Sequence, residues 1–362
     1  MAVKQRALRH VRDVFHWSRE ERFEVADVLA GAFGMAGPVL VGFLSGHEAA
    51  GFTAALGSLA ANGVERRGGV RDHLRREAEA LLPAILAPMV AIGLAASGVF
   101  SAVGLVLTVM IAALIGGLSR PIAVTSTRFI IILMILSAMP DLSRENGMGL
   151  LVLIVLGALW TSLLGLVFTA LTFGREANLT QEAPQRQPSA IQRLRYLSRS
   201  LRGLAGWSYT LRLGVCLSVA AVLQAIWPQH HLHWIGLTVV LLTARQPEPN
   251  AVKTTQRTLG TGIGVLLAEW ILRSPLPLGA LVVVIGVLAG ARRHFRPRNY
   301  LAYSVVMTLL IVVIKDAGQP PEFSLLADRL VATVIAGLLV TLSDWVFGLC
   351  VPTKPSLNRS GP

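Results

Sequence analysis

Long apolar stretches occur along the whole chain and alternate with short basic ones. A backbone that crosses lipid must satisfy its own hydrogen bonds, so such stretches form helices or a closed barrel. A barrel requires alternating polar and apolar residues, and runs such as LLVLIVLGALW show no alternation. The sequence therefore predicts an all-α integral membrane protein with about twelve transmembrane helices. The predicted spans are residues 25–45, 49–64, 80–98, 101–118, 121–139, 148–173, 209–228, 232–245, 257–272, 276–291, 299–315 and 326–350.

Composition supports the membrane class and argues against nucleic-acid binding. Hydrophobic residues make up 53% of the chain and charged ones 15%, whereas soluble domains average about 25% charged residues. The net charge of +13 lies in short segments between apolar runs, where it faces lipid headgroups. Of the 33 Lys and Arg residues, 28 fall on one side of the predicted layout. The positive-inside rule therefore places both termini in the cytoplasm, and the N-terminus has no pattern of a cleavable signal peptide.

An internal repeat relates the two halves of the chain. Matching features recur in the same order: Trp17-Ser18 with Trp207-Ser208, Arg76 with Arg257, Arg120-Pro121 with Arg296-Pro297, and Gly157 and Phe168 with Gly337 and Phe347. Each half has an even number of predicted spans, so both halves enter the membrane in the same direction. This pattern predicts two parallel six-helix repeats related by an axis along the membrane normal.

The predicted organisation has five parts. They are a cytoplasmic amphipathic segment (1–24), a first transmembrane repeat (25–173), a cytoplasmic linker with a basic amphipathic helix (174–208), a second transmembrane repeat (209–350) and a cytoplasmic tail (351–362). The second span is short in both halves, at residues 49–64 and 232–245. Short segments at matching positions are typical of broken helices that line a transport path.

Two cytoplasmic segments have apolar residues at helical spacing among basic ones. In residues 191–204 the apolar positions are Ile191, Leu194, Leu197, Leu201 and Leu204, and arginines fill the gaps. Residues 7–18 have a similar pattern. Each segment is either a helix that rests on anionic lipid or a connector helix packed against the base of the bundle.

Motifs of soluble enzymes and of metal sites are weak or absent. The sequence contains no HExxH, CxxC or GxSxG motif, and the glycines of residues 260–264 are better explained by close helix packing than by a phosphate loop. Cys216 and Cys350 lie in or beside apolar segments, where helix packing explains them. The cluster His230, His231 and His233 is interpreted as a solvated interfacial loop, with Trp234 at the headgroups, rather than as a metal site. We expect no enzymatic activity, no cofactor and no metal.

Charged residues inside predicted spans are costly and therefore informative. The set consists of Asp27, Arg128, Glu269 and Asp344. Arg128 lies seven residues beyond Pro121, or about 10 Å along a helix, and needs an ionic partner or an aqueous cavity. Asp27 and Asp344 are the candidate partners. The set is either a structural ion-pair system or a means of coupling transport to protons.

A short ordered motif lies between Trp234 and about Val313. It consists of Trp234, Leu237-Thr238, Gln246-Pro247, Thr255-x-Arg257-x-x-Gly260-Thr261-x-x-Gly264 and Asn299-Tyr300, with Arg329 and Gly337 in the closing segment. The motif resembles the fusaric acid resistance protein-like (FUSC) family, in the aromatic acid exporter group. The resemblance covers residues 209–350, and over 25–173 only the repeat supports it. It implies a bacterial inner-membrane protein that exports aromatic carboxylic acids with the proton gradient.

The sequence thus predicts a secondary transporter that exports an organic anion. Arg257 is expected to meet the carboxylate, Thr255 and Thr261 to donate hydrogen bonds, and Arg76 and Arg329 to shape the field. The first half lacks a Gly-Thr after Arg76, which favours a one-sided site. Two alternatives stay open: an anion channel, given a distant similarity to plant malate channels, and a membrane scaffold without a substrate. The expected partners are the anion and the lipid bilayer, and self-association into a homo-oligomer is left open.

Overall fold

The computed structural model describes residues 10–18, 25–61, 70–139, 147–176, 189–230, 232–243, 251–316 and 323–350. Within these ranges all regular structure is helical and no strand occurs, which confirms the predicted all-α class. The helices of the first half are α2 (Val25–Leu44), α3 (Glu48–Ala61), α4 (Val70–Ala96), α5 (Ser101–Ile115), α6 (Arg120–Ser137) and α8 (Gly147–Glu176). The linker forms α9 (Ala190–Ser200). The helices of the second half are α10 (Leu204–Ile226), α11 (His233–Leu242), α12 (Ala251–Arg273), α13 (Leu278–Phe295), α14 (Tyr300–Asp316) and α15 (Phe323–Cys350).

The starts of α6 and α14 show how local sequence sets helix boundaries. The Ser119 side chain accepts a hydrogen bond from the Ile122 amide at the start of α6, and proline follows in the first turn. Asn299 does the same at the start of α14, where its Oδ1 accepts from the Ala302 amide at 2.9 Å. Both are residues preferred before a helix, because a side-chain oxygen satisfies one of the amides that the first turn leaves open.

A helix occupies each range in which the sequence predicts a span, but the helices differ in length and polarity. Among the described residues, six helices are long and apolar enough to cross a membrane: those containing 78–96, 120–137, 147–168, 206–226, 278–295 and 327–349. The others are shorter or more polar. The 10 residues of α11 rise only about 15 Å, roughly half the thickness of a hydrocarbon core. The chain is therefore a multi-pass membrane protein in which six helices, rather than twelve, meet the criterion for a span.

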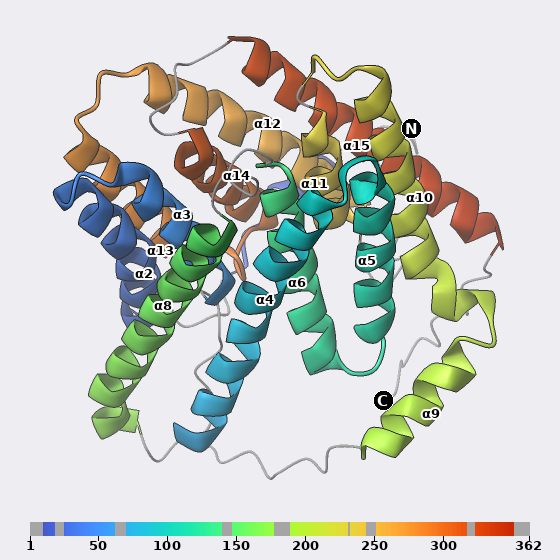
Figure 1. The fold of residues 1–362 in the computed structure, drawn as a ribbon, viewed down its shortest axis with the longest axis horizontal. Helices are drawn as coiled ribbons and strands as arrows, with labels where there is room; N and C mark the ends of the chain where they lie inside the picture. The colour runs from blue at the N-terminus through green and yellow to red at the C-terminus, as the bar shows by residue number, and fades with distance from the viewer. Residues whose placement is uncertain are drawn as a thin grey trace.

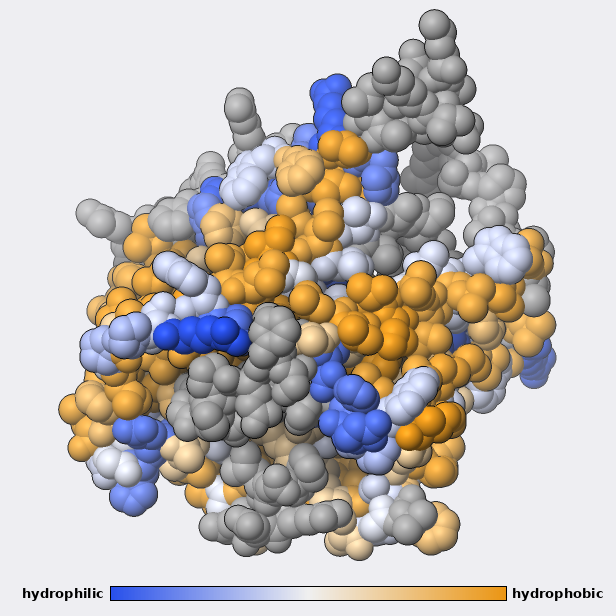
Figure 2. Space-filling model, turned by 90° about the horizontal axis from the view of Figure 1, so that it is seen from above, coloured by the Kyte–Doolittle hydropathy of each residue, from blue (hydrophilic) through white to orange (hydrophobic). Residues whose placement is uncertain are grey.

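The outer surface of the bundle is apolar, as lipid contact requires. In Figure 2 the orange, hydrophobic side chains spread over most of the described surface in view, with hydrophilic residues in separate patches. Large side chains such as Leu171, Trp270 and Leu349 are exposed. Soluble proteins rarely expose such large continuous apolar areas, so this surface is suited to a bilayer.

The helices of the two halves pack in corresponding pairs (Figure 1). In the first half α3 packs on α2 and α8, α4 packs on α6 and α8, and α5 packs on α6. In the second half α11 packs on α10 and α15, α12 packs on α14 and α15, and α13 packs on α14. Contacts between the halves also occur in matched form, since α2 packs on α13 and α5 packs on α10. The short helices α3 and α11 are buried along most of their length at the centre of these pairs.

Glycines allow the closest helix contacts. A Cβ atom on Gly260 would lie 2.5 Å from the Ser304 Cβ, and one on Gly264 would lie 2.7 Å from the Val305 carbonyl oxygen. These glycines are four residues apart, so they lie on one face of α12 and let α14 approach. The predicted packing role of the glycines in residues 260–264 is confirmed, and this contact fixes two walls of the cavity described below.

Candidate anion-binding site

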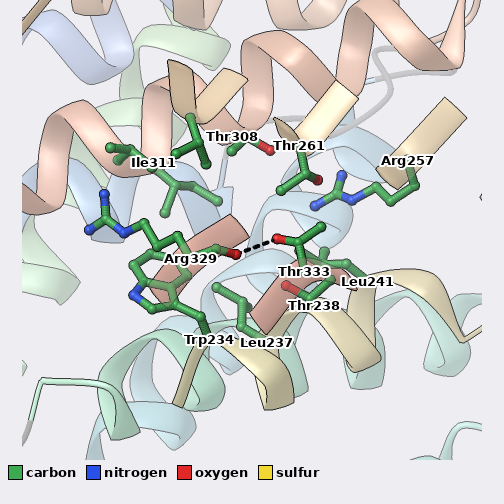
Figure 3. Close-up of a pocket in the computed structure, with 12 residues that line it drawn as sticks. Trp234, Leu237, Thr238, Leu241, Arg257, Thr261, Thr308, Ile311, Arg329 and Thr333 are labelled. Carbon is green, nitrogen blue, oxygen red and sulfur yellow. Dashed lines mark hydrogen bonds between the residues drawn. The ribbon is translucent and has the colours of Figure 1, made fainter. Parts of the chain in front are cut away.

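A cavity lies inside the second half, between α11, α12, α14 and α15 (Figure 3). Three of the residues that the sequence assigns to substrate binding line it together: Arg257 and Thr261 from α12, and Arg329 from α15. Arg257 and Thr261 are four residues apart, so both side chains lie on the same face of their helix. The packing of α12 against α15 thus brings Arg257 and Thr261 close to Arg329.

The floor and sides of the cavity combine hydroxyl groups with apolar surface. Thr238 comes from α11, Thr308 from α14 and Thr333 from α15, and the Thr333 hydroxyl donates to the Arg329 carbonyl oxygen at 2.8 Å. The apolar walls are formed by Trp234, Leu237, Leu241, Val265, Ile311 and Val312. Among the described residues no carboxylate lines the cavity, so its lining carries positive charge.

Arg257 and Thr261 are buried with polar atoms that lack partners. The Arg257 side chain is 3% exposed, and its Nε makes no hydrogen bond to the described residues. The Thr261 Oγ1 is likewise buried without a partner. The Tyr300 hydroxyl at the start of α14 interacts with the Arg257 guanidinium but leaves Nε open. Burying an unsatisfied charged donor costs free energy, and a ligand anion in the cavity would offset that cost.

Arg329 occupies the opposite side of the cavity. Its guanidinium carbon lies 4.6 Å from the ring centroid of Trp234, a distance at which a cation and an aromatic ring attract each other. In Figure 3 the Arg257 guanidinium points inward from one side, and Arg329 lies beside the Trp234 indole on the other. Trp234 is 9% exposed, so the prediction that it sits at the lipid headgroups is wrong. Stacking on Arg329 holds the indole inside the protein.

The cavity is small in this conformation. The space open to the centre of a water-sized sphere is ≈ 30 Å³, which is room for about two water molecules. An aromatic acid therefore fits only if the surrounding helices separate. The four walls come from four different helices, so a modest shift of α11 or α15 relative to α12 and α14 would enlarge the space.

Thr255 does not line the cavity. Its hydroxyl lies 3.1 Å from His10 Nε2, in a segment formed by residues 10–18 that we call the N-terminal strap. The side chain of Arg76, the remaining residue predicted to bind substrate, lies outside the described residues, and only the helical backbone of α4 is placed there. The structure thus gathers three of the five predicted binding residues.

The N-terminal strap covers the beginning of α12 and the turn before α14. Gln256 Nε2 donates to the Val14 carbonyl oxygen at 2.8 Å, and Asn299 Nδ2 donates to the His16 carbonyl oxygen at 2.9 Å. The Trp17 ring meets the Phe295 ring edge-on at 5.7 Å. Gln256 directly precedes Arg257 in the chain, so the strap lies against the helix turn that carries the main cation of the cavity.

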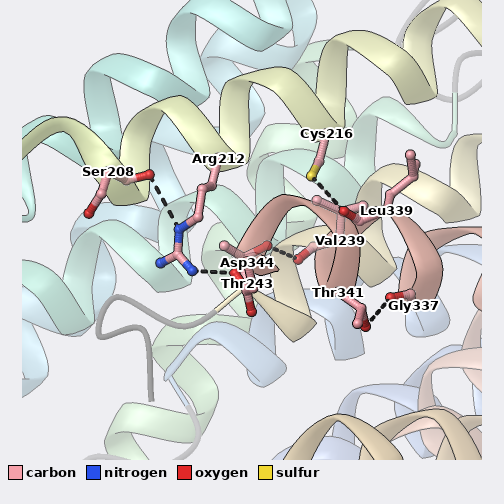
Figure 4. Close-up of polar contacts among 9 residues, drawn as sticks. All are labelled: Ser208, Arg212, Cys216, Val239, Thr243, Gly337, Leu339, Thr341 and Asp344. Carbon is pink, nitrogen blue, oxygen red and sulfur yellow. Dashed lines mark hydrogen bonds and ion pairs between the residues drawn. The ribbon is translucent and has the colours of Figure 1, made fainter. Parts of the chain in front are cut away.

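The charged residues predicted to couple protons do not form one cluster. Asp344 of α15 forms an ion pair with Arg212 of α10, whose Nε also donates to the Ser208 carbonyl oxygen (Figure 4). Glu269 pairs with Arg273 one turn along α12. Arg128 of α6 lies close enough to Arg292 for the two positive charges to repel each other. The side chain of Asp27 lies outside the described residues. Asp344 thus pairs with Arg212, two turns into α10, for which the sequence suggested no specific pairing.

The neighbourhood of the histidine cluster is also defined in part. His230 Nδ1 lies 2.9 Å from the Asp328 carboxylate, and His231 lies outside the described residues. Asp328 directly precedes Arg329, so this contact ties the α10–α11 connection to the beginning of α15.

The sequence did not predict the cavity residues Thr238, Thr308 and Thr333 as site residues, because a threonine in an apolar helix most often bonds to its own backbone.

Comparison with known proteins agrees with the location of the cavity. Residues 216–343 match the family model described as fusaric acid resistance protein-like. Over this segment the chain is similar to that family. The matched segment runs from Cys216 in α10 to Ser343 in α15, so it contains every residue that lines the cavity. The family points to a membrane transport protein of the efflux type. No curated protein and no solved structure matched the chain.

Proposed function

We propose that the protein exports an organic anion, an aromatic carboxylate, through the second-half cavity. Arg257 binds the carboxylate, the Thr261 hydroxyl donates a further hydrogen bond, and the ring packs against Trp234 and the aliphatic walls. The protein acts from the inner membrane of a bacterium with both termini in the cytoplasm, as the distribution of its basic residues favours. It is a transporter without enzymatic activity.

One observation carries the proposal: Arg257 Nε and Thr261 Oγ1 are both buried without a hydrogen-bond partner in the described part of the chain, and both residues line one cavity. A guanidinium presents donors in a planar fork that matches the two oxygens of a carboxylate. The described residues that line the cavity include no carboxylate, so a ligand is the natural source of the missing acceptors. The mixture of few polar groups with mostly apolar walls is typical of a small-molecule site.

The size of the cavity favours a transporter over a channel. An open channel needs a continuous aqueous path, whereas this cavity has room for about two waters. The matched helix pairings support an arrangement of two parallel six-helix repeats, in which α3 and α11 are broken helices that reach only part of the way across. Transport then requires one group of helices to rock against the other around the site.

Proton coupling is assigned to Asp344. Its side chain is 39% exposed while that of its partner Arg212 is 1% exposed, so protonation of the carboxylate would take the ion pair from a buried arginine. Such a change in charge would strain the contact between α10 and α15. Arg128, Glu269 and Asp27 remain secondary candidates.

The test measures efflux of radiolabelled benzoate from proteoliposomes that contain the purified protein and an imposed proton gradient. Arg257→Ala removes the guanidinium and is expected to lower the initial rate at least about tenfold, corresponding to the loss of about 1.4 kcal/mol of binding or more. Arg257→Lys keeps the charge without the planar fork and is expected to fall between wild type and Arg257→Ala.

Arg120→Ala serves as the matched control, because Arg120 is an exposed arginine at the start of α6. It is expected to transport at the wild-type rate. All variants must reconstitute in equal amounts and elute as single species. A wild-type rate in Arg257→Ala would reject the site. A benzoate current that persists after collapse of the proton gradient would favour the channel alternative.

A further inference from the structure

Helix α9 stands apart from the rest of the molecule. In Figure 1 it lies at one corner of the structure, and the helix that it packs on is α10, which follows it in the chain. A Cβ atom on Gly117 in the α5–α6 turn would lie 3.0 Å from Leu197 Cδ1, so Leu197 touches the bundle there. Ser189 and Gln192 form a capping box that starts the helix, so its beginning is set by its own sequence.

The apolar face of α9 is largely uncovered. Ile191 is 64% exposed and Leu194 is 62% exposed, although both belong to the apolar set that the sequence places at helical spacing. Of the two interpretations of this segment, a connector packed on the bundle is therefore the poorer one. The helix is also shorter than the predicted segment, since it ends at Ser200 and a turn separates it from Leu204.

The basic charge of α9 limits which binding partner can cover its apolar face. Residues 190–203 contain four arginines, Arg193, Arg195, Arg199 and Arg202, and no acidic residue. Arg195 and Arg199 are exposed. A second copy of this chain would bring an equally basic helix and repel it. An anionic lipid leaflet suits α9 better, because its acyl chains can take up the apolar side chains and its headgroups can pair with the arginines.

The position of α9 in the chain places it near such a surface. The turn of residues 201–203 is the only connection to α10, whose apolar membrane window begins at Gly206. Three residues span at most about 10 Å, so the end of α9 cannot lie far from the plane in which α10 enters the hydrocarbon. A helix tethered there reaches the headgroup region without any rearrangement of the bundle.

We propose that α9 is an interfacial helix that binds anionic phospholipid, with Ile191 and Leu194 inserted between the headgroups and the arginines paired with lipid phosphates. This site is separate from the anion cavity and does not depend on the transported substrate.

The experiment uses the full chain in lipid nanodiscs, with Cys216 and Cys350 replaced by alanine and one new cysteine labelled with a polarity-sensitive fluorophore. Leu194→Cys reports on the apolar face. Arg199→Cys lies five residues further on, about 140° around the helix, and serves as the matched control. Discs contain either phosphatidylcholine alone or phosphatidylcholine with phosphatidylglycerol.

The label at position 194 is expected to emit at shorter wavelength in anionic discs than in neutral discs, and 1 M salt is expected to reverse the shift because charge interactions are then screened within about 3 Å. The label at position 199 is expected to shift less. Replacement of all four arginines by glutamine is expected to abolish the lipid dependence at position 194.

Equal emission at position 194 in both kinds of disc would overturn the proposal. So would a shift that appears only when discs hold two copies of the protein, because the second copy would then be the occupant. Every labelled variant must elute from size exclusion as the unlabelled protein does, so that a folding defect is not mistaken for a change in lipid contact.

Discussion

The two halves of the molecule pair their helices in the same way but fill the centre of each half differently. In the first half α3 and α8 touch through their backbones: a Cβ atom on Gly57 would lie 1.9 Å from the Ile154 carbonyl oxygen, and one on Gly157 would lie 1.8 Å from that of Ala54. The described buried positions of α4 are alanines at residues 80, 84, 87 and 91 and prolines at residues 83 and 88. In the second half the corresponding helices are α11, α12 and α15. They carry Trp234, Arg257 and Arg329, which line the cavity.

This difference shows that helix pairing alone does not create a binding site. Small residues let helices meet at the shortest distance and leave no space between them. Large side chains keep the helices apart, and the gap that remains can take a ligand if polar atoms face it. The expectation that binding is one-sided stays a prediction, because the side chain of Arg76 lies outside the described residues.

The N-terminal strap and helix α9 also differ, in how firmly each is held against the helix bundle. The N-terminal strap is fastened to the second half by side-chain hydrogen bonds from Gln256 and Asn299 and by the Trp17–Phe295 contact. Helix α9 approaches the α5–α6 turn of the first half through Leu197 and leaves its apolar face open. The closely held segment thus lies over α12, which lines the cavity, and the loosely held one lies against α10 and the α5–α6 turn, which do not.

The largest effect on stability is expected at Gly157 and Gly337, which occupy matching positions in the two halves. Gly157→Ala places a methyl group 1.8 Å from a backbone oxygen of α3, so α3 and α8 must separate, and overpacking of this kind costs about 1–3 kcal/mol or more. Gly337→Ala meets Thr258 Oγ1 at an ordinary 3.4 Å and is expected to be neutral or stabilising by about 0.5–1 kcal/mol. Thermal unfolding in detergent measures both. Equal stability of the two variants would contradict the proposed difference in packing.

The ion pair between α10 and α15 is expected to give the next largest effect. Asp344→Ala leaves Arg212 buried without its carboxylate, and loss of one partner of a fully buried pair costs about 3–5 kcal/mol. Because Asp344 is 39% exposed, we expect a loss at or below the lower end of that range. Glu269→Ala breaks an exposed pair within α12 and is expected to cost less than about 1 kcal/mol. Denaturant or thermal titration of both variants compares them, and a larger loss for Glu269→Ala would refute the ranking.

The smallest expected effect separates a functional hydroxyl from a structural one. Thr261→Val keeps the side-chain shape and removes an oxygen that lacks a partner, so stability is expected to stay equal or rise slightly. Benzoate transport is expected to fall about five- to tenfold, the loss of about 1 kcal/mol from one hydrogen bond. Thr341→Val, which removes an exposed hydroxyl that bonds to the Gly337 carbonyl oxygen, should leave transport unchanged. A destabilised Thr261→Val with normal transport would show that the hydroxyl serves the fold.

Local patterns in the sequence were enough to determine the helices. Apolar runs predicted a helix in each of the twelve ranges, and every one of these ranges contains a helix. The motif of α12 also predicted that Arg257 and Thr261 act together, and both line the cavity, because a guanidinium and a hydroxyl on one helix face depend only on helical periodicity. These features are local, so a single sequence contains the information for them.

Contacts between distant segments were decided by the tertiary structure. The sequence placed Trp234 at the headgroups, but stacking on Arg329, 95 residues further along the chain, holds it inside. It gave Thr255 a role in binding, but the N-terminal strap takes up that hydroxyl. Arg212 and Asp344 meet because α10 packs on α15. Side-chain partners of this kind depend on which helices become neighbours, and the apolar faces that drive helix packing are too alike along this chain to specify those neighbours in advance.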